Sequence, residues 1–312
     1  MKARIILSAD KKDFYKELFS LAIPIGMQNL LVALISATDA LMLGRFSQDA
    51  VSAVSLANQV VFIMNLFIGA VVGGGGVLLA QYWGKGDRTM VKNIFCTILK
   101  WAFGISLVFF AFAMFIPETL MRIYTPEPKL IEIGTSYLRA VAFSYLFSGI
   151  TNCYYLMMKL EGKAVKSVYI SVVTLITDMV IDLFLIYGLC GVPRLGANGS
   201  AYSTVVVELV ALVWCITESH KKGSLRPDLQ GFKWFSKAIT KDMFKVSLPM
   251  LGSSLAWGLG FSLHSLIMAS WFGCDRCRIH YLCGAGTDYL CLQGHLRRCG
   301  HYGGQAARQE YV

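Results

Sequence analysis

Charge is scarce in this chain. Asp, Glu, Lys and Arg together make up 15% of its 312 residues, against about 25% in soluble domains. Hydrophobic residues make up 55%, and the mean hydropathy is +0.56. A soluble domain with one large core is excluded by this balance. Long apolar segments cross a bilayer as helices, which satisfy their own backbone hydrogen bonds, so the sequence predicts an all-α membrane protein.

The patterns that carry enzyme chemistry are also missing. No nucleophile stands beside a base, and no glycine-rich loop with a following lysine offers a phosphate site. The scattered cysteines Cys96, Cys153, Cys190 and Cys215 show neither disulfide nor metal spacing. The glycine run 73–76 lies in an apolar segment, where it favours close helix packing or a kink. We therefore expect no enzymatic activity and no cofactor.

Seven apolar segments are each near the roughly 20 residues that a helix needs to cross a bilayer. They are 18–43, 51–80, 93–116, 134–158, 166–189, 197–217 and 246–269. The sequence thus predicts a six-helix lobe over 1–217, a connector over 218–245, and the first helix of a second lobe over 246–269. In the connector, Trp234 and Phe235 favour a segment on the membrane surface, and a plain solvated linker is the alternative.

The basic residues alternate between the two ends of these segments. Nineteen Lys and Arg lie in the N-terminal stretch and the even-numbered loops, against four in the opposite loops. By the positive-inside rule, the N-terminus is cytoplasmic. Because these residues separate apolar segments instead of forming a basic surface, the net charge of +10 does not indicate nucleic acid. The expected partner is the lipid bilayer, and no protein partner is implied.

Three aspartates, Asp39, Asp178 and Asp182, lie inside predicted spans. A charged residue there costs about 2.5 kcal/mol or more and is by default a functional candidate. Asp178 and Asp182 are four residues apart, on one face of a helix. Alternatives are an interfacial position for Asp39 or Asp182 and helix packing for Asp178. Arg139 and Glu208 also lie in spans, and whether they pair with each other or with the aspartates is left open.

Carboxylates that share a site repel one another, which favours uptake of a proton. Their hard oxygen atoms also suit Na⁺. From the residues alone, the three aspartates are candidates for handling Na⁺ or H⁺, with no catalytic or transition-metal role.

Two segments of the chain resemble each other. Pro24 and Pro249 are 225 residues apart, and His264 matches Asp39 at the same offset. Repeated lobes are a common plan in transporters. The segment 270–312 then departs from the pattern, with five of the nine cysteines and no apolar span.

Two interpretations of 270–312 are open. Cys274 and Cys277, with Cys291 and His295, have roughly the spacing of a zinc site. Alternatively, the segment is an aberrant, frameshifted tail. Shifted by one frame, the codons for 271–277 permit a sequence that resembles 47–53, which lies 224 residues earlier. We favour the frameshift, which implies a truncated second half.

Residues 14–217 resemble the N-terminal lobe of the multidrug and toxic compound extrusion (MATE) transporters. The resemblance rests on Pro24 with Gln28-Asn29, DALMLGR at 39–45, AVSAV at 50–54, LANQ at 56–59, AQYWGKGD at 80–87, LEGK at 160–163 and GANGSAYST at 196–204. It implies one half of a twelve-helix fold, in a bacterial plasma membrane.

The resemblance also implies a function and its residues. MATE transporters exchange Na⁺ or H⁺ for amphipathic, often cationic drugs or toxic metabolites. Asp39, Asp178, Asp182 and Thr204 match the family's ion-coupling positions, although many relatives have Asn at 178, which leaves Na⁺ and H⁺ both open. Pro24, Gln28 and Asn58 are the implied candidates for the substrate cavity. The alternatives are an inactive truncated fragment and a lipid-linked saccharide flippase.

Overall fold

The computed structural model describes residues 11–188, 194–221, 225–227, 231–232 and 236–271. These residues form helices and no strand, which confirms the predicted all-α fold. The helices are α1 (Lys11–Phe46), α2 (Gln48–Lys85), α3 (Arg88–Phe115), α4 (Pro117–Tyr124), α5 (Pro128–Leu160), α6 (Ala164–Tyr187), α7 (Ala197–Ser219) and α9 (Lys237–Trp271). Trp234, Phe235 and the segment 272–312, with its zinc and frameshift interpretations, lie outside the described residues.

Each predicted span coincides with one long helix to within six residues, except at two beginnings. Helix α1 begins seven residues before its predicted span, and α9 begins at Lys237 instead of Val246. Four described helices, α2, α3, α6 and α7, are both long and apolar enough to cross a membrane. Helices α1, α5 and α9, of 36, 33 and 35 residues, are also long enough to cross a membrane.

Short helix α4 was not predicted. It begins with Pro117, whose fixed φ suits a first helical turn. Glu118 and Arg122, one turn apart, form an ion pair of 2.6 Å on its exposed face. Its eight residues are too few and too polar to register as an apolar segment, so hydropathy alone placed a loop here.

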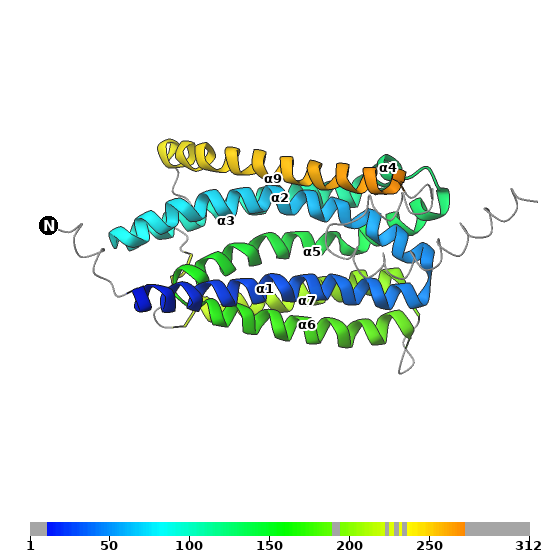
Figure 1. Ribbon diagram of the computed structural model, residues 1–312, viewed down its shortest axis with the longest axis horizontal. Coiled ribbons are helices and arrows are strands. Elements are labelled where there is room, and N and C mark those ends of the chain that lie inside the picture. Colours follow the sequence, from blue (N-terminus) through cyan, green and yellow to red (C-terminus); the bar gives the residue numbers. More distant parts are fainter. Residues whose placement is uncertain (1–10, 189–193, 222–224, 228–230, 233–235, 272–312) are drawn as a thin grey trace, which may run out of the picture.

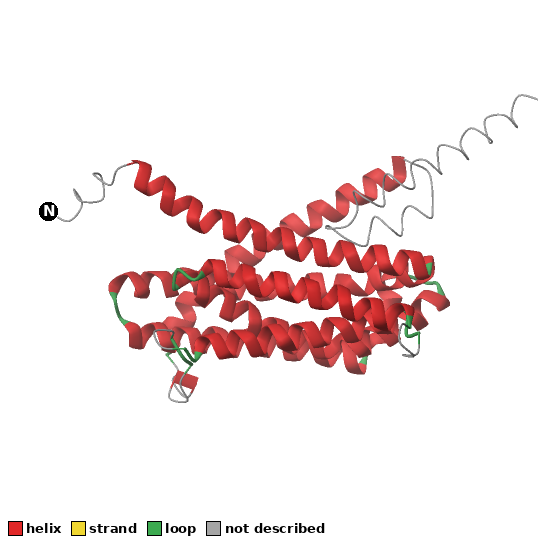
Figure 2. Cartoon of the chain, turned by 90° about the horizontal axis from the view of Figure 1, so that it is seen from below, coloured by secondary structure: helices red, strands yellow, loops and turns green. Residues whose placement is uncertain are grey.

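The long helices lie side by side along the molecule, with α5 in the middle (Figure 1). Helix α5 packs against α2, α3 and α7, while α1 packs against α6 and α9 against α2. Figure 2 shows the N-terminal half of α1 standing away from the other helices. In that half, Phe19, Ile23, Met27 and Leu30 are exposed apolar side chains. The C-terminal half of α1 is therefore the part that the bundle holds.

The glycine run of α2 permits close helix packing, one of its two predicted roles. A Cβ on Gly74 would lie 2.1 Å from the Ser247 hydroxyl and 2.8 Å from the Ser247 backbone of α9. A Cβ on Gly75 would lie 2.5 Å from Ile98 of α3. Side chains at these positions would clash, so glycine is what lets α3 and α9 approach α2.

The AQYWGKGD string builds the turn between α2 and α3. Gly86 ends α2 at a φ of +79°, which only glycine adopts without strain. Asp87 then caps α3 by accepting a hydrogen bond of 3.0 Å from the Met90 backbone N–H. The Arg88 guanidinium lies 3.7 Å from the ring centre of Trp83, across the same turn. These contacts give the string a structural role.

Candidate cation-binding site

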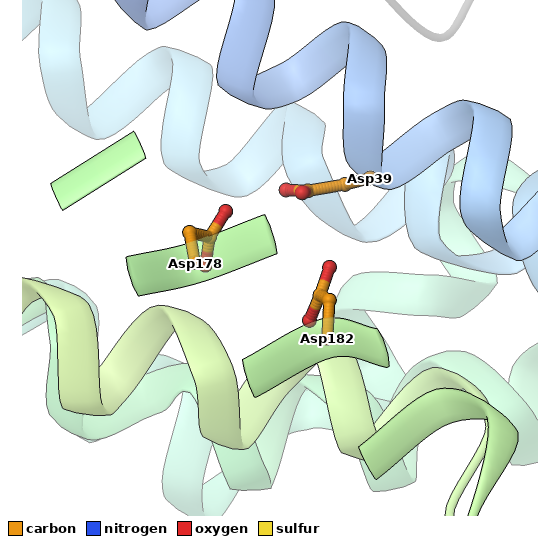
Figure 3. A group of neighbouring side chains, drawn as sticks. All are labelled: Asp39, Asp178 and Asp182. Carbon is orange, nitrogen blue, oxygen red and sulfur yellow. The ribbon is translucent and has the colours of Figure 1, made fainter. Parts of the chain in front are cut away.

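The three predicted aspartates meet in space. Asp39 extends from α1, and Asp178 and Asp182 extend from α6, with all three carboxylates pointing toward one another (Figure 3). One oxygen atom of each lies within 4.8 Å of the other two. Asp178 is 2% exposed, Asp182 is fully buried and Asp39 is half-buried. We call this group the aspartate triad.

Helix α6 carries two of the carboxylates on one face because residues four apart lie one turn above each other. It is held from both sides. The Tyr187 hydroxyl at its end donates a hydrogen bond of 3.0 Å to the Met42 carbonyl of α1. On the other side, a Cβ on Gly199 of α7 would lie 2.8 Å from the Leu185 carbonyl oxygen. The triad therefore lies where both α1 and α7 pack against α6.

One hydroxyl from α7 contacts the triad. Ser203 of α7 donates a hydrogen bond of 2.7 Å to Oδ1 of Asp178. The neighbouring Thr204, which the family resemblance implied, donates instead to the Ser200 carbonyl at 2.9 Å, as hydroxyls in membrane helices often do. Sequence reasoning missed Ser203. The sequence pattern that could have identified Ser203 is Gly199, one turn earlier on α7. Two small residues on one helix face permit the close approach of a neighbouring helix.

Three further oxygen atoms of the triad lack donors. Both carboxylate oxygens of Asp182 and Oδ1 of Asp39 are buried and accept no hydrogen bond from any described residue. No lysine, arginine or histidine among the described residues forms an ion pair with the triad. Burying unpaired carboxylates is costly, and a cation or proton would remove that cost. The donor set is all oxygen, which fits a hard cation.

The other predicted residues either lie apart from the triad or have side chains outside the described part of the structure. Asn58 is exposed on α2, where its Oδ1 accepts a hydrogen bond of 3.4 Å from the Tyr137 hydroxyl. Pro24 and Gln28 lie within α1, and their side chains are outside the described ones. Arg139 is exposed and Glu208 half-buried, and the two form no ion pair with each other in the described part of the chain.

A second acidic group lies at the C-terminal ends of α5 and α7. Both oxygens of Glu218 pair with lysines, Oε1 with Lys166 and Oε2 with Lys221. Glu161 Oε2 lies 2.6 Å from Lys163 Nζ, and its Oε1 accepts a hydrogen bond of 2.7 Å from the Leu225 backbone N–H. Each glutamate side chain is 6% exposed. We call this group the glutamate clamp, since it joins the α5–α6 turn to the chain after α7.

Comparison with known proteins identifies the family. The MatE family model matches residues 24–184, which is just over half of the chain, and the chain belongs to this family. Its relatives include a protein named uncharacterized transporter YisQ from Bacillus subtilis, 23% identical over 78% of this chain and 53% of that protein. Another is the probable multidrug resistance protein NorM of Thermotoga maritima, 23% identical over 81% of this chain and 54% of that protein.

Solved structures show the same fold. A MOP superfamily transporter from Pyrococcus furiosus superimposes with a TM-score of 0.69 at 20% identity, over 82% of this chain and 54% of that one. A MATE transporter crystallised with MaD3S gives a TM-score of 0.71 at 20% identity, over 81% of this chain and 57% of that one. The chain thus spans about half the length of the relatives it matches.

Proposed function

We propose that this chain forms the cation-binding lobe of an antiporter that exports amphipathic, often cationic compounds in exchange for Na⁺ or H⁺. The observation that carries the proposal is the aspartate triad, with three carboxylate oxygens within 4.8 Å and no basic partner among the described residues. Relatives named multidrug resistance proteins, such as NorM of Thermotoga maritima and PmpM of Pseudomonas aeruginosa, support the export of drugs.

The mechanism follows from where the triad sits. Its three negative charges repel each other across the α1–α6 contact. A bound cation or proton offsets this repulsion and draws α1 toward α6. Because the C-terminal half of α1 is held through Met42 and its N-terminal half stands away from the bundle, α1 is the element whose position the ion biases. The ion gradient then drives alternation between two states.

In this proposal the chain lies in a bacterial plasma membrane with its N-terminus in the cytoplasm. The charge distribution in the sequence supports that orientation. The glutamate clamp is then on the cytoplasmic side, and α4 is on the outer side.

The test measures efflux of ethidium from an efflux-deficient bacterium that expresses the 312-residue chain, with either a Na⁺ or a proton gradient imposed. We expect efflux that follows one gradient and is lost in Asp39→Asn and Asp182→Asn. Asp49→Asn, an exposed carboxylate paired with Lys129, is the matched control. Efflux that is unchanged in both triad variants would sink the assignment of the site.

A second candidate is a lobe that binds the cation without transporting. The triad favours it, because its oxygen atoms lie close enough together to hold a cation without a substrate cavity. Binding of ²²Na⁺ to the purified chain separates the two. Sodium bound at the triad with no efflux supports the second candidate, and efflux excludes it.

A further inference from the structure

A large groove opens between four helices of the bundle. It has a volume of about 1180 Å³ and is formed by α3, α4, α5 and α7. None of its lining residues comes from α1 or α6, which carry the triad, or from α9. In Figure 1, α4 marks the end of the bundle where the groove lies. In the proposed orientation, this is the outer end.

One face of α5 forms the floor of the groove. Glu132, Ser136, Arg139 and Phe143 line it in steps of three or four residues, which places them along one side of the helix. Arg139 and Phe143 lie about 8 and 14 Å inside the span predicted to begin at residue 134, at 1.5 Å per residue. The floor therefore changes from charged at the membrane surface to apolar within the bilayer.

The walls repeat this gradient. Glu118 and Arg122 of α4 stand at the outer end and pair with each other. Tyr202 and Val205 of α7 line the inner part. The α7 wall is tied to the floor, since the Asn198 amide nitrogen donates a hydrogen bond of 2.8 Å to the Ser136 hydroxyl.

Two charges in the groove have no partner in the described part of the chain. Arg139 and Glu132 are exposed, line the groove and form no ion pair. An arginine within a span is expensive unless it meets an anion, and guanidinium groups bind phosphate through paired hydrogen bonds. Seven residues nearer the outer end, Glu132 offers a carboxylate to a cation.

We propose that this groove binds a phospholipid whose headgroup carries both a phosphate and a primary ammonium. Arg139, reaching outward along its flexible stem, holds the phosphate with Ser136. Glu132 holds the ammonium, and one acyl chain lies over Phe143 and Val205. The order of negative, positive and apolar groups along the floor matches ammonium, phosphate and acyl chain.

The test uses native mass spectrometry of the purified 312-residue chain after exchange into equimolar phosphatidylethanolamine, phosphatidylglycerol and phosphatidylcholine. We expect phosphatidylethanolamine to be retained about tenfold more than either other lipid, equivalent to about 1.4 kcal/mol. Arg139→Gln should lower retention of all three, and Arg139→Lys should restore part of it. Glu132→Gln should abolish the preference while retaining phosphatidylglycerol.

Controls separate this site from the triad and from a folding defect. Glu127→Gln changes an exposed carboxylate just before the start of α5 that does not line the groove, and should leave retention unchanged. Asp182→Asn should also leave it unchanged, so loss of ion coupling and loss of lipid binding are distinguishable. Equal retention of all three lipids, retention unaffected by Arg139→Gln, or displacement of the lipid by ethidium would each overturn the proposal.

Discussion

The aspartate triad and the glutamate clamp are both acidic groups in nearly buried positions, but only one is neutralised. Each carboxylate of the clamp contacts a lysine, and Glu161 also accepts a backbone N–H. Within the triad, Oδ1 of Asp178 accepts a hydrogen bond from Ser203, while both oxygens of Asp182 have no donor among the described residues. A buried charge with partners supports the fold, whereas one without partners creates a demand for a ligand.

The largest expected effect is that Na⁺ raises the free energy of unfolding by binding at the triad, with no contribution from the glutamate clamp. At 100 times its Kd, a ligand that binds only the folded state adds about 2.7 kcal/mol to the free energy of unfolding. We expect such an increase in NaCl over choline chloride, measured by denaturant titration in detergent at pH 8. Asp182→Asn should abolish the increase and Glu218→Gln should keep it. The reverse pattern would refute a cation site at the triad.

A second prediction concerns stability without sodium. Asp182→Asn should raise the free energy of unfolding by about 2 kcal/mol in choline chloride at pH 8, because an amide of the same shape buries no charge. The same titration measures it, with Asp49→Asn as the control for removing an exposed carboxylate. A lower stability of Asp182→Asn would mean that the triad is already satisfied within the chain.

A third prediction distinguishes two neighbouring hydroxyls. Ser203→Ala removes the hydrogen bond to Asp178, and bonds to charged groups contribute about 1.5 kcal/mol or more. We expect the Kd for ²²Na⁺, measured by equilibrium dialysis, to rise about tenfold. Thr204→Ala removes only a bond to its own helix and should leave the Kd unchanged. If Thr204→Ala has the larger effect, the sequence-based choice of Thr204 was the better one.

The smallest effect is expected at the clamp. Glu218→Gln should lower the free energy of unfolding by about 1 kcal/mol, independently of Na⁺. The loss stays modest because the side chains of Lys166 and Lys221 are 49% and 66% exposed and remain hydrated. Titration in NaCl and in choline chloride checks it. A stabilised Glu218→Gln variant would show that the clamp is strained and remove the contrast with the triad.

Much of the fold could be predicted because long apolar segments identify membrane helices in a sequence. The long apolar segments became long helices, and the spacing of Asp178 and Asp182 placed both on one face of α6. The short helix α4 was missed, since its eight residues carry too little apolar character to stand out. The position of Asp39 in an apolar segment made it a candidate, but only the family resemblance implied that it shares a site with Asp178, because 139 residues separate the two.

The sequence by itself determined the helices and the presence of expensive charges within them, since both follow from the cost of moving polar groups into lipid. Only the tertiary structure decided which charges are neutralised. Glu218 meets Lys166 across 52 residues, and Ser203 meets Asp178 across 25. Hydropathy assigns the same cost to every carboxylate, but partners come from helix packing, and that packing separates a clamp from a candidate ion site.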